Sequence, residues 1–193
     1  FHYQLIYTQI NRDKSNKPSF KHYYLNVNRD QYFNPASTVK MPVAFLALEK
    51  LNTMNKAGIN KFTTMLTDSA YNGQTTVTAD SSSENGMPSV AQYIRKIFLV
   101  SDNDAYNRLY EFVGQKTINE RLWQMGYKDF RLTRRFVRAT PEENRHTNPV
   151  RFLDDKGNLI YRQPGAYSDV NFDFSKKVLV GNAHYDRAEN FIA

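Results

Sequence analysis

Two segments near the start of the chain combine aromatic and β-branched side chains. They are residues 2–10 (HYQLIYTQI) and residues 20–27 (FKHYYLNV), and the polar stretch 11–19 separates them. Short runs of this kind, bounded by turn-forming residues, are typical of strands. We expect the two segments to pair as an antiparallel hairpin with a long loop.

Helical periodicity dominates the middle of the chain. Residues 43–51 are apolar on almost every side, which predicts a buried helix. Residues 90–100 carry a single apolar stripe, and residues 105–113 resume a helical pattern that ends at Gly114. Residues 117–125 open with T-I-N-E, the pattern of a capping box, so a further helix is expected there.

The pattern changes again after Gly126. Residues 139–149 are polar and predict a loop, and residues 150–162 predict a hairpin about the turn 155–158. Residues 164–193 show no clear periodicity. Strands followed mainly by helices indicate the α+β class, with a helical lobe packed on a mostly antiparallel sheet.

Composition is that of a folded chain. Hydrophobic residues make up 40% of the 193 residues, which is enough to bury a core and argues against disorder. No run of about 18 apolar residues exists, so we expect no transmembrane segment. The chain opens with Phe1 rather than Met, without a visible signal peptide, so we expect that a preceding segment was removed.

Charge and metal-ligand spacing exclude several partners. The net charge is +7, but most Lys and Arg are scattered singly, as on an ordinary solvated surface. One basic patch, Arg131, Arg134, Arg135 and Arg138, is too short a footprint for nucleic acid, so no nucleic-acid partner is expected. Cysteine is absent, the four histidines lie far apart, and no glycine-rich phosphate loop occurs, so we expect neither metal nor cofactor.

Ser37-Thr-Val-Lys40 has the spacing of a nucleophile and its base. A serine hydroxyl needs an adjacent base, and residues three apart share one face of a helix. A lysine whose pKa is lowered by burial can accept the serine proton. The alternative is an N-cap serine followed by a solvent-facing lysine, and the apolar helix directly after the motif favours the catalytic interpretation.

Ser101-Asp102-Asn103 lies between two predicted helices. A second hydroxyl relays a proton to a leaving amine, and an amide hydrogen-bonds both a lysine and a substrate. The alternative is an ordinary N-cap for the helix that begins near Ala105.

Together the two motifs resemble the penicillin-binding and class A β-lactamase family. Their order, their separation of about 60 residues and the sequence around Ser37 (FNPASTVKMP) carry the resemblance, which covers residues 1–150. It implies a β-lactamase/transpeptidase-like fold in a single domain over residues 1–193. Within it, 1–34 supply N-terminal strands, 35–149 the helical lobe with the motifs, and 150–193 a hairpin or insertion without an assigned role.

The resemblance also implies roles for four residues. Ser37 attacks the carbonyl of a β-lactam or of a D-Ala-D-Ala-type peptide to form an acyl-enzyme, and its backbone N–H forms half of an oxyanion hole. Lys40 takes part in proton removal, Ser101 relays a proton to the leaving nitrogen, and Asn103 holds Lys40 and the substrate. Such substrates imply an exported protein, periplasmic or associated with the cell envelope.

Two departures from the family pattern stand out. The Lys-Thr/Ser-Gly motif of a late strand is missing, and Lys176-Lys177-Val178 does not match it. We therefore expect a chain truncated before that motif, with the C-terminal strands outside it. Phe136 falls about where class A enzymes carry the deacylating glutamate, and Glu142 and Glu143 are more readily interpreted as loop charges.

The leading hypothesis is a β-lactamase-like serine hydrolase that acts through an acyl-enzyme on Ser37. A D,D-peptidase or penicillin-binding protein with slow deacylation is the first alternative, because the glutamate is missing. A non-catalytic relative that acts as a binding module is the second, and the retention of all four polar residues argues against it.

Overall fold

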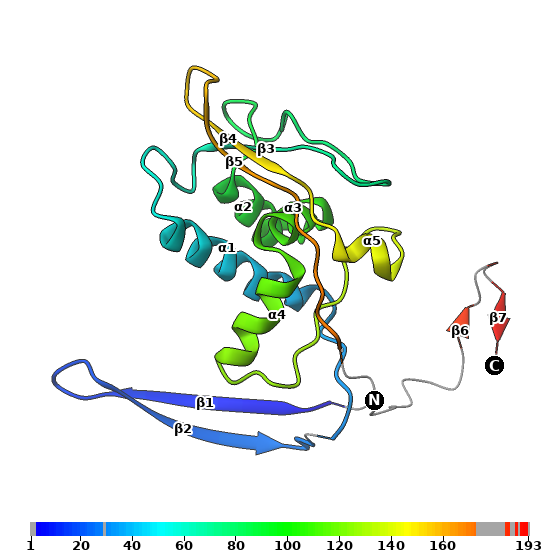
Figure 1. Ribbon diagram of the computed structural model, residues 1–193. Helices are drawn as coiled ribbons and strands as arrows, with labels where there is room; N and C mark the ends of the chain where they lie inside the picture. The colour runs from blue at the N-terminus through cyan, green and yellow to red at the C-terminus, as the bar shows by residue number, and fades with distance from the viewer. Residues whose placement is uncertain (1–2, 29, 173–183, 186–187, 189, 193) are drawn as a thin grey trace. The chain divides into compact units, whose positions relative to one another are not determined.

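The chain divides into two compact units. A computed structural model describes residues 3–28, 30–172, 184–185, 188 and 190–192. One unit comprises residues 1–34 and 173–193, and the other comprises residues 35–172 (Figure 1). All four predicted site residues belong to the second unit.

The first unit contains the predicted N-terminal hairpin. Strands β1 (Leu5–Arg12) and β2 (Pro18–Leu25) pair antiparallel, from Leu5 opposite Leu25 to Arg12 opposite Pro18. The Asp13 carboxylate closes the turn by accepting two backbone N–H groups at 2.9 Å. The loop is shorter than predicted because cross-strand pairing continues through polar positions.

Two short strands, β6 (His184–Tyr185) and β7 (Phe191–Ile192), also pair antiparallel in this unit. The segment Lys176-Lys177-Val178, which does not match the family's Lys-Thr/Ser-Gly motif, lies outside the described residues.

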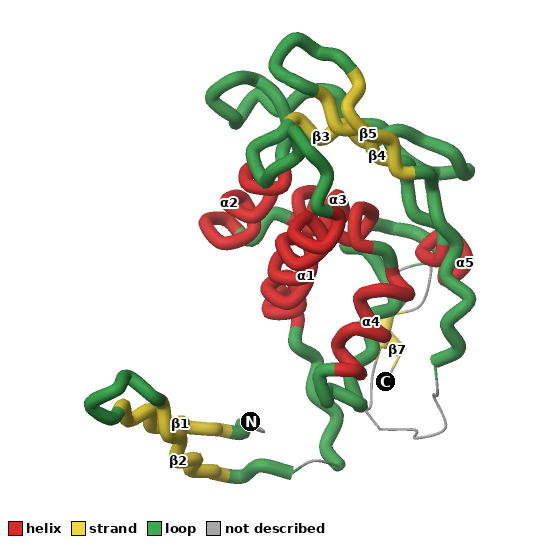
Figure 2. Tube along the Cα trace, turned by 60° about the vertical axis from the view of Figure 1, so that its left-hand side comes forward, coloured by secondary structure: helices red, strands yellow, loops and turns green. Residues whose placement is uncertain are grey.

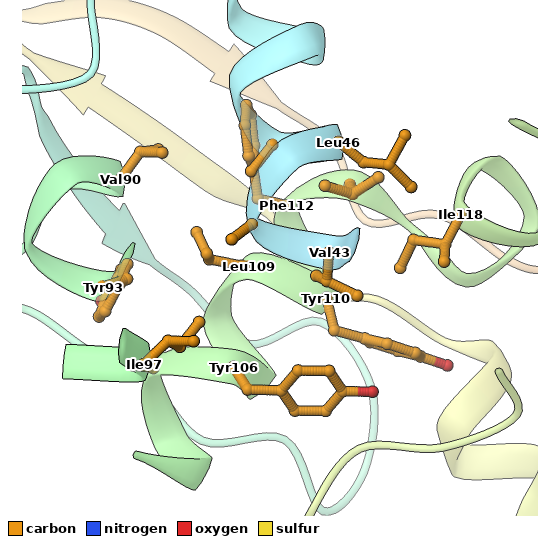
Figure 3. Packing of buried hydrophobic residues seen from close by; sticks show 14 of the residues in the cluster. Val43, Leu46, Val90, Tyr93, Ile97, Tyr106, Leu109, Tyr110, Phe112 and Ile118 are labelled. Carbon is orange, nitrogen blue, oxygen red and sulfur yellow. The ribbon is translucent and has the colours of Figure 1, made fainter. Parts of the chain in front are cut away.

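Helices form the core of the second unit. They are η1 (Ala36–Val39, a 3-10 helix), α1 (Lys40–Met54), α2 (Val90–Val100), α3 (Asn103–Val113), α4 (Gln115–Gln124) and α5 (Pro141–Arg145). Helix α3 packs against both α1 and α2. Figure 3 shows the shared core, in which Val43, Leu109, Tyr110 and Phe112 are fully buried. Burial of the apolar α1 is as the sequence predicts.

A three-stranded antiparallel sheet lies over the helices, as Figures 1 and 2 show. Its order is β3-β4-β5, with bounds Thr64–Thr67, Val150–Leu153 and Leu159–Gln163. The Phe152 ring meets the Phe112 ring edge-on at 5.6 Å, which joins the sheet to α3. The predicted hairpin of residues 150–162 is confirmed, as is the α+β class.

Helix boundaries show where local sequence signals succeed and fail. The bounds of α2 are those predicted, whereas the capping box predicted at Thr117 is wrong. Helix α4 begins at Gln115 directly after Gly114, so Thr117 lies in its first turn. The structure instead places a capping box at Thr140–Glu143, where T-P-E-E opens α5 inside the predicted loop.

Candidate active site

Ser37 lies in the 3-10 turn η1, immediately before α1. The helix on which Ser37 and Lys40 were expected to share a face is therefore a 3-10 turn at Ser37, and the α-helix begins only at Lys40. A 3-10 helix has three residues per turn, so Ser37 and Lys40 lie on the same side of it. Pro42 falls in the first turn of α1, where a missing backbone N–H costs no helical hydrogen bond.

Lys40 is the buried member of the site. It is only 2% exposed, whereas Ser37, Ser101 and Asn103 are exposed. The Lys40 Nζ lies 3.3 Å from Ser37 Oγ, 3.0 Å from Ser101 Oγ and 2.7 Å from Asn103 Oδ1. It also donates to the Ser101 carbonyl oxygen. The structure thus brings together all four residues that the sequence singled out.

The junction between α2 and α3 supplies Ser101 and Asn103. Ser101 ends α2 in the left-handed conformation, with φ 55°, and its N–H donates to the Ile97 carbonyl at 3.0 Å. The Asp102 carboxylate caps α3 by accepting the Ala105 N–H at 2.8 Å. The capping interpretation therefore holds for Asp102, which leaves the side chains of Ser101 and Asn103 to contact Lys40.

Burial lowers the pKa of Lys40, and the nearby Asp102 carboxylate opposes this by raising it. A charged amine would offer three N–H donors to these four oxygens. A neutral amine keeps two donors, which suit the Ser101 carbonyl and the Asn103 amide oxygen. Its lone pair is then left for the Ser37 hydroxyl, which is the arrangement of a general base and its nucleophile.

Phe136 contacts Lys40 from the loop that follows α4. The Lys40 Nζ lies 5.1 Å from the centre of the Phe136 ring. The Asn107 Oδ1 accepts the Phe136 N–H at 2.7 Å, and the Tyr106 ring packs against the Phe136 ring at 4.8 Å. Sequence reasoning missed Asn107, although its position four residues after Asn103 places both on one face of α3.

Charged residues attach the same loop to α3. The buried Glu111 carboxylate lies 3.1 Å from both Arg108 and Arg135. The backbone N–H of Arg135 donates to the Asn144 Oδ1 at 2.9 Å. Because Arg135 is buried, the four loop arginines do not share one exposed basic surface.

The two loop glutamates have other partners. Glu143 accepts the Thr140 N–H at 2.5 Å as part of the capping box, and this hydrogen bond lowers the pKa of Glu143. Glu142 lies 3.2 Å from the His146 ring. Both lie on α5 rather than in a loop, which corrects the expectation of loop charges: Glu142 is exposed, whereas Glu143 is partly buried and caps the helix.

Within the described ranges, no group of three His, Asp or Glu side chains is placed to hold a metal ion. Among the same residues, no helix combines the length and apolar character needed to cross a membrane.

Comparison with known proteins identifies one family. The family model described as the beta-lactamase enzyme family matches residues 15–160. Searches of curated proteins and of solved structures find no significant match. The matched range includes the Ser37 turn, the α2–α3 junction and the Phe136 loop.

Proposed function

Because the chain belongs to the beta-lactamase enzyme family, we propose that it is a serine hydrolase that forms an acyl-enzyme between Ser37 and a β-lactam. The observation that carries this proposal is the buried Lys40 amine, which meets the side-chain oxygens of Ser37, Ser101 and Asn103 within 3.3 Å. A small β-lactam or a D-Ala-D-Ala-type peptide is the substrate class, and either one favours an exported protein.

Each of the three side-chain contacts of Lys40 has a role in the proposed reaction. Neutral Lys40 accepts the Ser37 proton as Oγ attacks the carbonyl carbon, and the Ser37 N–H supplies part of the oxyanion hole. The C–N bond of the lactam then breaks, and Ser101 relays a proton from Lys40 to the leaving nitrogen. Asn103 holds Lys40 in place and offers its amide N–H to the substrate.

Intact mass of the protein mixed with benzylpenicillin tests the proposal. We expect an increase by the mass of the drug, lost in Ser37→Ala and kept in Thr38→Ala, a matched control one residue away. Labelling that persists in Ser37→Ala would show that the nucleophile is wrongly assigned.

A second candidate function is favoured by the surroundings of Lys40. Phe136 contacts Lys40 where class A enzymes carry a glutamate, and Glu142 and Glu143 are engaged elsewhere. Without a carboxylate base the acyl-enzyme would persist, as in a penicillin-binding protein or D,D-peptidase. An adduct that lasts for hours supports this second candidate, whereas rapid loss with accumulation of hydrolysed drug supports a β-lactamase.

A further inference from the structure

An aromatic ring, rather than a polar group, covers the Lys40 amine on the side of the Phe136 loop. We propose that Phe136 is a positioning residue for acylation: its ring keeps water from Lys40 and so keeps that amine a base. This inference rests on the proposed acyl-enzyme function, because it concerns the reactivity of the group that activates Ser37.

The ring is held in this place by contacts on two sides. The Asn107 side chain fixes the Phe136 backbone, and the Tyr106 ring packs against the Phe136 ring. The Tyr106 hydroxyl also donates to the Arg134 carbonyl at 2.9 Å, which holds the loop two residues before Phe136. Such support allows a partly buried ring to exclude water in a defined position.

The ring has two opposite effects on the amine. Its face attracts a cation, which favours protonated Lys40. Its bulk removes water from the ammonium, which favours the neutral amine. Lys40 is only 2% exposed, and its burial affects its pKa more than Asp102 does, so we assign the greater weight to the exclusion of water.

Few charged groups oppose this effect. Asp102, at the start of α3, raises the pKa of Lys40, but its carboxylate also lies 3.8 Å from Lys96 Nζ. In the Phe136 loop, Arg135 is paired with Glu111 rather than directed at Lys40. Behind the ring, burial raises the pKa of Tyr106, so this phenol stays neutral in the working range.

The acylation rate with benzylpenicillin, measured from pH 5 to 10 by intact mass, tests the inference. In Phe136→Ala, water reaches Lys40. We therefore expect the acid limb of the pH–rate profile, where the rate falls as Lys40 becomes protonated, to move up by about one pH unit. Below that limb the rate should fall about tenfold, and at high pH it should approach the wild-type rate. Phe136→Leu should retain the wild-type limb, because an aliphatic side chain also excludes water.

Two further variants control for effects of the Phe136→Ala substitution other than the loss of the ring. Val137→Ala changes the exposed neighbour of Phe136 and should leave the profile unchanged. Phe136→Gln places a hydrated amide near Lys40 and should show the same shift as Phe136→Ala, so it serves as the test if the alanine variant does not fold. An unmoved limb in the folded Ala or Gln variant overturns the inference. Absence of any adduct in the wild-type protein overturns the proposed function instead.

Discussion

Backbone strain flanks the candidate nucleophile and its partner. Ala36, directly before Ser37, has φ 45°, and Ser101 has φ 55°. Left-handed conformations cost a residue with a side chain about 1 kcal/mol, and they persist where the surrounding structure fixes them. Here each bends the chain where a side-chain hydroxyl must face Lys40, one ahead of α1 and the other between α2 and α3.

Replacement of Phe136 by glutamate should shorten the life of the acyl-enzyme. A carboxylate at this position would contact Lys40 and could act as general base for a water molecule, an effect typically worth about 10²-fold or more. We therefore expect the benzylpenicillin adduct of Phe136→Glu to decay faster while hydrolysed drug accumulates. Intact mass and absorbance of the drug measure the two quantities.

Phe136→Gln is the matched control, because it has the same length without a base. Its adduct should persist like that of the wild-type protein. Equal adduct lifetimes in the Glu and Gln variants would show that Phe136 does not occupy the place of a deacylating base.

At the scale of elements, α3 organises both the site and the Phe136 loop. Its first residue, Asn103, contacts Lys40. Its next turns hold the loop through Asn107 and Glu111, and helix α5 through Tyr110. One helix therefore positions both the amide and the aromatic ring that contact the amine. This connection gives the long loop after α4 a fixed conformation without regular secondary structure.

An ion pair between Asp68 and Arg151 joins the end of β3 to β4. Loss of this pair should make the free energy of unfolding less dependent on pH in the acid range. Asp68, just after β3, accepts two hydrogen bonds from Arg151 on β4 at 2.7 and 2.8 Å. These bonds lower the pKa of Asp68 below its unfolded value, so their stabilisation is present above about pH 4 and is lost as pH falls through the folded pKa. Asp68→Asn should cost about 1 kcal/mol at pH 7.

Urea unfolding of the wild-type and Asp68→Asn proteins between pH 2 and pH 7 measures this difference. The gap between the two should narrow as the pH falls below about 4. Asp129→Asn, an exposed carboxylate, is the control and should change stability little at any pH. A gap that stays constant with pH would mean that Asp68 does not carry the pH dependence.

At the scale of the whole molecule, the two units differ in how they are stabilised. The α1–α3 region has a buried core, whereas every residue of β2 is exposed. A two-stranded hairpin is marginally stable by itself. We therefore expect backbone amides of α3 to exchange with deuterium far more slowly than those of β1 and β2, as hydrogen-exchange mass spectrometry would show.

Residues 60–68, which include β3, provide an internal reference, because this short sheet strand is mostly buried. Exchange in β1 and β2 as slow as in α3 would contradict the prediction and show that another surface covers the hairpin.

The sequence by itself determined features that rest on local chemistry. Apolar periodicity predicted the bounds of α2. Aromatic and β-branched residues indicated the N-terminal hairpin, and the turn at residues 155–158 indicated the second hairpin. The spacing of Ser37 and Lys40 predicted the nucleophile and base on which the proposed reaction rests, and the order of motifs indicated the family that the comparison then showed. Each of these signals is a pattern along the chain, either between near neighbours or in the order of short motifs, so it can be recognised without a fold.

Only the tertiary structure decided the features that depend on packing between distant segments. Residues 61 positions apart meet where Ser101 contacts Lys40, and Phe136 reaches the same amine from beyond α4. The capping box at Thr117 failed because Gly114 already ends one helix and begins the next. Hydrophobic periodicity shows which face of a segment is buried, but not which other segment covers that face. The environment of Lys40 depends on the segments that pack around it, so only the tertiary structure defines it.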